Sequence, residues 1–345
     1  MKRSTLVAIK AALLFLLLPF AQSVRGQDIH FSQFYNSPLS LSPALTGVHS
    51  GDYRFIGNYR SQWQSALVPY TTFFGTADVK FFNPRKPNGY FSGGLIFSYD
   101  AAGDAKLSTT HVGLSGSYTL AIDTENFLTL GIYGGVIQRA FQPGELTFDH
   151  QFSDIFDPNR PTNEDFQSTS RVFADFGAGL NYHGQSTSKR SKLDVGGGVY
   201  HLTNPDGSFS DADNAEIPMR VSLYMMPVIQ IATPLDWVLH GSAQLQGSYF
   251  EALAGTGLLI HLSNHRAREV AVQVGANYRF NSFGDAIIPT VELHLYNQWK
   301  VGVSYDINVS DFSVATNNYG GPEVSVQYLI TKVRPLDKFK ICKLF

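Results

Sequence analysis

Histidines and one acidic, proline-rich run are the residues of this 345-residue chain whose chemistry could build a metal site. Zinc sites need ligands at short regular spacings such as HExxH, and a calcium loop needs evenly spaced acids with a glycine. Residues 157–165 (DPNRPTNED) lack that spacing, so we expect a solvated surface loop there. The histidines are scattered, and we expect polar filler rather than metal ligands at His111, His150, His183, His201, His240, His261, His265 and His294.

Serine and glycine patterns do not indicate a catalytic or nucleotide site either. A hydrolase triad is recognised by mutual geometry, and here no spacing singles out one set of serine, histidine and acid. The glycine clusters at 196–198 and 254–257 are not followed by the Lys-Ser/Thr pair of a phosphate loop, so we expect strand glycines that allow bending. We therefore expect a protein that is not an enzyme and uses no cofactor or metal.

The first 26 residues are typical of a secretion signal. Lys2 and Arg3 precede the apolar run 11–20, and small residues before Gln27 suit a signal peptidase. A ten-residue run is too short to cross about 30 Å of hydrocarbon as a retained helix. Cleavage would remove four basic and no acidic residues, leaving 22 basic against 28 acidic residues and a net charge of −6. That charge argues against a nucleic-acid partner.

The rest of the chain alternates between apolar and polar residues, which is the pattern of β-strands with two different faces. In residues 299–308 (WKVGVSYDIN) every second side chain is apolar or aromatic and the others are glycine or polar. Proline cannot donate to a ladder, so Pro227, Pro289 and Pro322 each require a strand end or a bulge. Repeated along the chain, the test predicts about fourteen strands, near residues 52–63, 71–82, 90–100, 107–120, 126–141, 171–183, 191–203, 218–232, 236–247, 250–262, 268–280, 286–296, 299–308 and 320–331.

Connection lengths and composition favour a barrel in a membrane over a soluble propeller or sandwich. The long connections 142–170, 204–217 and 309–319 alternate with short turns, as extracellular loops and periplasmic turns do in outer-membrane barrels. Charged residues are only 16% of the chain, and the polar strand faces are mostly uncharged, which suits a lumen better than a soluble exterior. We therefore expect an all-β fold, a transmembrane antiparallel β-barrel of about 14 strands over residues 51–331.

Four short motifs carry a resemblance to a known family. Residues 28–47 read DIHFSQFYNSPLSLSPALTG and residues 59–63 read YRSQW. Residues 320–324 read GGPEV, and the chain ends in FKICKLF. In order and spacing these motifs resemble the PorP/SprF family of outer-membrane proteins associated with type IX secretion and gliding motility. Two positions depart from the family pattern, because Ser42 stands where Asn is common and Lys343 stands in place of Pro.

The resemblance implies protein export or cell-surface attachment from the outer membrane. The implied partners are outer-membrane lipid, components of the type IX machinery and a secreted adhesin-like protein. The alternative is a porin-like or substrate-specific channel, which conductance in planar bilayers would distinguish. The family-motif and partner candidates are Phe31, Ser32, Gln33, Phe34, Pro43, Ala44, Gly47, Tyr59, Arg60, Gln62, Trp63, Gly320, Gly321, Pro322, Glu323, Cys342 and Phe345.

The segment after the signal has neither a helix nor a strand period, yet it carries several large apolar side chains. We expect residues 27–50 to form an irregular lead-in that plugs the barrel at its periplasmic mouth, rather than a mobile tail. Arg60 is expected to make a structural ion pair at the rim or in the lumen, for example with Asp78, rather than to contact a partner. Trp63 is expected to anchor the strand at the membrane interface.

Two further regions complete the expected organisation. The loop 142–170 is the best candidate for an extracellular contact surface. Residues 332–345 are expected to form a periplasmic tail. Cys342 is the only cysteine of the chain, and it would pair with a cysteine of a partner or remain a free thiol packed near Phe345.

Overall fold

Long strands make up most of the computed structural model, which describes residues 28–62, 70–82, 88–103, 106–153, 155–157, 159–161, 168–209, 215–263, 269–281, 285–309 and 319–331. The first seven are β1 (Tyr53–Gln62), β2 (Tyr70–Phe81), β3 (Gly89–Ala102), β4 (Leu107–Ala121), β5 (Asn126–Ala140), β8 (Ser170–Gln185) and β9 (Lys192–Tyr200). The other seven are β10 (Arg220–Ala232), β11 (Leu235–Gln246), β12 (Tyr249–Ser263), β13 (Val270–Asn281), β14 (Asp285–Leu295), β15 (Trp299–Asn308) and β16 (Tyr319–Ile330). The predicted antiparallel barrel of about fourteen strands is confirmed.

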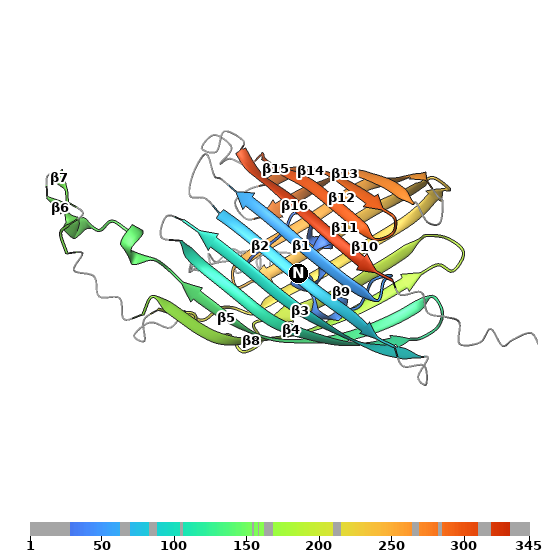
Figure 1. Cartoon of the computed structure of the whole chain (residues 1–345), viewed down its shortest axis with the longest axis horizontal. Coiled ribbons are helices and arrows are strands. Elements are labelled where there is room, and N and C mark those ends of the chain that lie inside the picture. The colour runs from blue at the N-terminus through green and yellow to red at the C-terminus, as the bar shows by residue number, and fades with distance from the viewer. Residues whose placement is uncertain are drawn as a thin grey trace, which may run out of the picture.

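These strands form one closed antiparallel barrel (Figure 1). Each strand pairs with the next along the chain, and β5 pairs with β8 across a long connection. The barrel closes where β1 pairs with β16, in a register that runs from Tyr53 opposite Ile330 to Arg60 opposite Glu323. Closure pairs the backbone groups that an open edge would expose, which is the condition for a sheet to lie in hydrocarbon.

Side chains alternate between a polar lumen and an apolar outer wall, as the sequence pattern predicts. On β15, Ser304 and Asp306 are buried inside the barrel, whereas Val303 and Tyr305 are exposed on the outside. Exposed leucines and isoleucines recur around the wall, and Ile132 is 70% exposed. A wall of this composition is unfavourable in water and favourable in lipid, so the barrel lies in a membrane rather than in solution.

The prolines within strands lie where the ladder is interrupted. Pro227 pairs with Leu193 of β9, whereas the pairing of β10 with β11 skips residues 226 and 227. Pro289 likewise pairs with β13 while the ladder to β15 skips residues 288 and 289. Pro322 lies opposite Tyr305, where the register of β15 and β16 shifts. Each proline therefore avoids a position that needs its missing N–H donor.

The two ends of the barrel differ in their connections. We call the end with residues 63–69, 103–106, 141–169, 201–219, 247–248, 282–284 and 309–318 the loop end, and the opposite end the turn end. Outer-membrane barrels carry their longer connections outside the cell, so we expect the loop end to be extracellular and the turn end periplasmic. The longest connection, residues 141–169, contains η3 (Pro143–Glu145), η4 (Asp149–Gln151) and the hairpin of β6 (Phe152–Ser153) and β7 (Ile155–Phe156).

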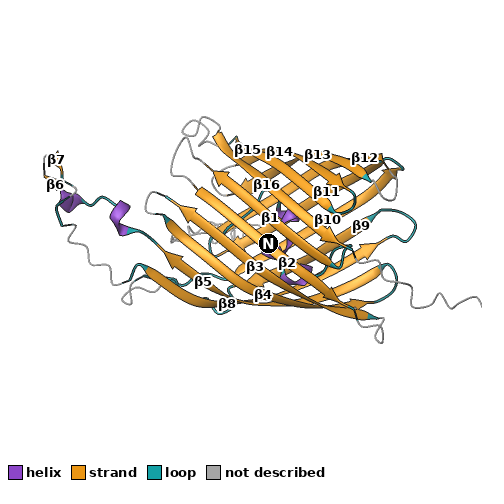
Figure 2. Cartoon of the chain, viewed as in Figure 1, coloured by secondary structure: helices purple, strands orange, loops and turns teal. Residues whose placement is uncertain are grey.

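The segment before β1 folds into three short helices inside the barrel, drawn in purple in Figure 2: η1 (Phe34–Asn36), α2 (Pro38–Leu41) and η2 (Pro43–Leu45). Pro38 and Pro43 each begin a helix, a position where the missing N–H costs nothing. The Ser42 hydroxyl caps η2 by accepting the Ala44 N–H. No helix in the described ranges is long and apolar enough to cross a membrane.

Candidate functional site

The N-terminal segment, residues 28–50, passes through the lumen from the loop end to the turn end. At the loop end the Asp28 N–H donates to the Gln246 side chain over 2.9 Å. At the turn end the Gly47 N–H donates to the Asp78 carboxylate over 2.7 Å. We expected the segment at the periplasmic mouth. It instead occupies the depth of the barrel, because the wall offers it polar partners from one end to the other.

Between these ends the segment forms an apolar core with the barrel wall. Phe31, Phe34, Leu39 and Leu41 are each at most 1% exposed, and Leu45 is 2% exposed. Fully burying a side chain of this size contributes roughly 1.5–3 kcal/mol, so the segment is held as the core of the molecule. The buried wall residues that meet it are Phe74, Ile96, Tyr133, Tyr200, Tyr224, Leu253, Ala286 and Ile288.

The first and third family motifs meet at a buried carboxylate. The backbone N–H groups of Ser32 and Gln33 donate to the two oxygens of Glu323, each over 2.8 Å. The Gln33 side chain also donates to the Glu323 carbonyl over 3.1 Å. A Cβ on Gly321 would lie 1.9 Å from the Ser61 carbonyl oxygen, so only glycine fits there. The carboxylate thereby fixes the height of the segment in the lumen.

The second motif reaches the same place through Arg60, whose side chain is 2% exposed. Its guanidinium lies 2.7 Å from the Asp306 carboxylate and donates to the His30 carbonyl over 2.5 Å. Arg279 approaches Asp306 to 2.7 Å from the other side, and Arg60 Nε lies 3.9 Å from Glu323. The two arginines therefore offset the cost of burying the Asp306 carboxylate.

Arg60 makes the expected ion pair inside the barrel, but its partner is Asp306 and not Asp78. In the register of β1 and β2, Asp78 lies directly opposite Arg54, and six residues of strand, about 20 Å, separate Arg54 from Arg60. Arg54 forms a two-pronged bond to Asp78 over 2.9 and 2.8 Å and donates to the Leu45 carbonyl. Gly47, which also binds Asp78, has φ +74°, a conformation that favours glycine.

Three glycines of the wall give the segment room to approach. Gly131 pairs with Gly179, and Gly179 pairs with Gly198, so the three lie side by side on β5, β8 and β9. A Cβ on Gly131 would lie 2.3 Å from the Ala44 nitrogen, and one on Gly179 would lie 2.1 Å from Ser42 Oγ. The cluster at 196–198 was expected to allow bending. Gly198 leaves space for the chain where α2 meets η2, since a Cβ there would lie 2.4 Å from the Leu41 carbonyl oxygen.

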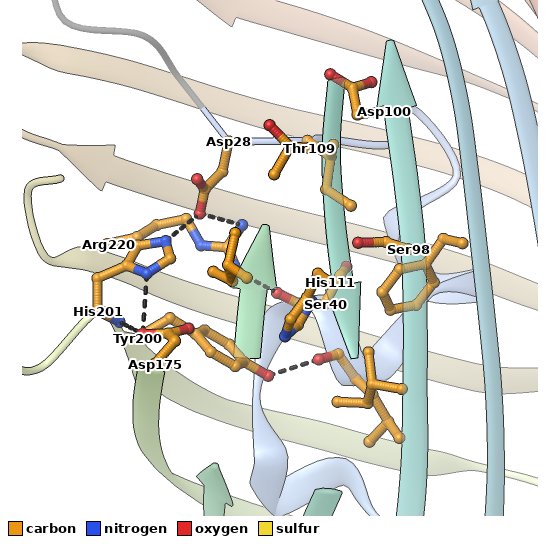
Figure 3. Close-up of a pocket in the computed structure, with 15 residues that line it drawn as sticks. Asp28, Ser40, Ser98, Asp100, Thr109, His111, Asp175, Tyr200, His201 and Arg220 are labelled. Carbon is orange, nitrogen blue, oxygen red and sulfur yellow. Dashed lines mark hydrogen bonds and ion pairs between the residues drawn. The ribbon is translucent and has the colours of Figure 1, made fainter. Parts of the chain in front are cut away.

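A cavity of about 90 Å³ remains beside Asp28 in the loop-end half of the lumen (Figure 3). His201 lies 2.6 Å from the Asp28 carboxylate and 3.0 Å from that of Asp175. Burial opposes a charge on His201, but the two carboxylates outweigh it and raise its pKa to about 9. Burial likewise opposes a charge on Asp28, and His201 and Arg220 outweigh it and lower its pKa. This ionic cluster secures the start of the segment.

The remaining predicted residues fall into three groups. Pro43 and Ala44 are buried in η2. Tyr59 and Pro322 are exposed on the outer wall, and Gln62 is half-buried at the end of β1. Three predicted regions lie outside the described residues. They are the signal sequence, Trp63, and the C-terminal tail with Cys342 and Phe345. Within the described residues, His, Asp, Glu and Cys side chains form no group of three suited to a metal ion.

A closed barrel with an apolar wall and a lumen filled by its own N-terminal segment defines a plugged outer-membrane β-barrel. Residues 23–328 match the profile of a family described as "Type IX secretion system membrane protein PorP/SprF", and the chain belongs to this family. A search of curated proteins finds no match.

Solved structures with a similar fold are outer-membrane barrels. The CymD monoaromatic hydrocarbon channel is 9% identical with a TM-score of 0.50, over 87% of this chain and 94% of that one. BamA from Haemophilus ducreyi lacking POTRA domains 1–3 is 10% identical, with a TM-score of 0.42 over 81% and 70% of the chains. CdiB from Escherichia coli is 10% identical, with a TM-score of 0.44 over 79% and 63%. At 9% identity the likeness to the CymD channel shows the fold alone.

Proposed function

We propose that this barrel serves type IX secretion as a non-catalytic, non-conducting component that helps to export a secreted adhesin-like protein or hold it at the cell surface, where such proteins support gliding. The family profile supports a secretion role in the outer membrane. The observation that carries the proposal further is the filled lumen, since residues 31–45 are packed there as a core.

A porin-like or substrate-specific channel is the competing function. Channels of that kind keep an aqueous path, whereas here hydrogen bonds and the Asp28–Arg220 ion pair fix the segment to β1, β2, β10, β15 and β16. The segment is also continuous with β1, so it stays attached to the barrel. These features favour a role in which the secreted protein meets the outer surface of the barrel and does not cross its lumen.

Removal of the gene from the native bacterium tests this proposal. We expect one or a few secreted proteins to be lost from the cell surface and found in the medium or retained inside, while uptake of small solutes is unchanged. Re-expression of the wild-type chain should restore them. Unchanged surface proteins together with slower uptake of a small solute would favour a channel and contradict the proposal.

A further inference from the structure

The connection 141–169, which we call the arm, extends away from the barrel and has structure of its own. Figure 1 shows β6 and β7 beyond the ends of the barrel strands. Within the arm, the Gln151 side chain accepts the Phe148 N–H and donates to the Arg160 carbonyl, and Gln151 is 6% exposed. The Asp157 N–H also donates to the Gln151 carbonyl. The arm is therefore a folded projection organised around one buried glutamine.

The base of the arm is fixed to the next long connection. The rings of Phe141 and Phe209 meet edge to face with centroids 4.8 Å apart. The Arg139 guanidinium lies 5.8 Å from the centre of the Phe209 ring. The Phe141 N–H donates to the Thr169 carbonyl over 3.1 Å, which closes the base. These contacts hold the arm at the loop end.

The tip of the arm exposes large apolar side chains. Phe152 is 63% exposed, Ile155 is 78% exposed and Phe156 is 43% exposed, all within the β6–β7 hairpin. Their position beyond the barrel strands separates them from the lipid-facing wall. Clustered apolar side chains in water are unfavourable and commonly mark a surface that a partner covers.

Charge separates the two ends of the molecule. The loop-end connections hold twelve acidic side chains: Asp104, Glu145, Asp149, Asp154, Asp157, Glu164, Asp165, Asp206, Asp211, Asp213, Glu216 and Asp311. They hold two basic ones, Lys106 and Arg160, which leaves a net charge of −10. The turn-end connections hold six basic side chains against three acidic ones, Asp123, Glu125 and Glu269. These basic residues are Arg85, Lys86, Lys189, Arg190, Arg266 and Arg268.

We propose that the arm is the docking surface for a secreted protein whose contact face is an apolar groove with a basic rim. The tip residues Phe152, Ile155 and Phe156 would enter the groove, and the surrounding acids would attract the rim. A second copy of this chain would bring an equally acidic loop end and be repelled, and anionic lipid headgroups would be repelled in the same way. The inference rests on the proposed function, since it names the surface that the secreted protein meets.

Site-specific photo-crosslinking in the native bacterium tests the proposal. The variant Ile155→p-benzoylphenylalanine places the reactive group at the tip, and Ile122→p-benzoylphenylalanine, at a 61% exposed position of the turn end, is the matched control. We expect a secreted protein to be crosslinked at position 155 and absent at position 122. Crosslinks at position 155 to lipid, to a second copy of this chain or to nothing would overturn the proposal.

The secreted protein identified by crosslinking is then purified without a crosslink, and its affinity for the full barrel in nanodiscs is measured. This affinity tests whether apolar and electrostatic contacts of the arm bind it. The combined variant Phe152→Ser, Ile155→Ser and Phe156→Ser should weaken binding roughly tenfold or more. Asp149→Asn with Asp157→Asn should weaken it less and reduce its dependence on salt. Asp123→Asn with Glu125→Gln makes the same charge change at the turn end and should have no effect. Equal affinity for all variants, or binding that salt does not weaken, would contradict the inference.

The two proposals fail in different ways. If removal of the gene strips secreted proteins from the surface and the tip variant retains them, the arm is not the docking surface while the secretion role stands. If neither change affects the surface proteins, the proposed function itself fails.

Discussion

Arg60 of β1 lies 2.7 Å from Asp306 of β15, although these strands are not neighbours and β16 lies between them. The pair therefore crosses the seam at which the barrel closes. Ser32 and Gln33 bind Glu323 of β16 at the same point. Docking of the N-terminal segment and closure of the barrel are thus parts of one arrangement, which explains why three motifs far apart in sequence share one function.

Replacement of Glu323 tests this arrangement. Glu323→Ala leaves two buried backbone N–H groups without an acceptor and removes one of the two carboxylates near Arg60. We expect the free energy of unfolding in detergent to fall by about 3–5 kcal/mol. Val324→Ala, on the lipid-facing side of the same strand, is the control and should cost about 1 kcal/mol or less. Equal losses in the two variants would show that Glu323 does not hold the segment.

The glycines of the wall provide a steric test. Gly131→Ala places a Cβ 2.3 Å from the Ala44 nitrogen, so the segment must shift or the wall must deform, at a cost of about 1–3 kcal/mol. Gly57→Ala is the matched control, because nothing lies within 4 Å of its new Cβ. Digestion of the folded barrel by a protease that cuts after aromatic residues should be faster near Phe34 only in the first variant. Equal resistance of the two variants to the protease would argue that η2 does not pack against the wall at Gly131.

The ionic cluster at Asp28 should depend on pH. The pKa of His201 is raised to about 9, so its contribution to stability is complete below its ordinary value of 6.5 and is lost as pH rises through 9. The pKa of Asp28 is lowered, so its contribution is present above its ordinary value of 3.8 and is lost in acid. The difference in the free energy of unfolding between wild type and His201→Gln should be large at pH 6 and shrink above pH 9. A difference that is constant over this range would contradict the assignment.

The barrel could be predicted from the sequence because alternation is a local property. Residues 299–308 show their two faces without reference to any other strand, and β15 has these bounds. Local facts also favoured closure, since charge-poor polar faces and apolar outer faces suit a lumen and a membrane better than a soluble exterior. The prolines were correctly assigned to interruptions of the ladder, because their missing donor is a property of the residue itself.

The site could be predicted only in part, because its contacts join distant residues. The motifs identified Ser32, Arg60 and Glu323, but their meeting depends on pairs separated by up to 291 positions. Asp306 belongs to the same cluster and lies outside the motifs, so only the register of β15 and β16 reveals it. Asp78 was assigned to the wrong arginine for the same reason. The alternation shows which face of the sheet a residue lies on, but not its position along the barrel axis.

Single-channel recording on the purified full-length protein in a planar bilayer tests the central claim most directly. A lumen packed with residues 28–50 should give no steady current at moderate voltage, and deletion of residues 28–46 should produce open steps if the shortened barrel still inserts. As a second variant, Arg54→Ala with Arg60→Ala loosens the segment without shortening the chain and should produce intermittent openings. Steady open steps from the wild-type protein, of the same size as those of the deletion variant, would contradict the account.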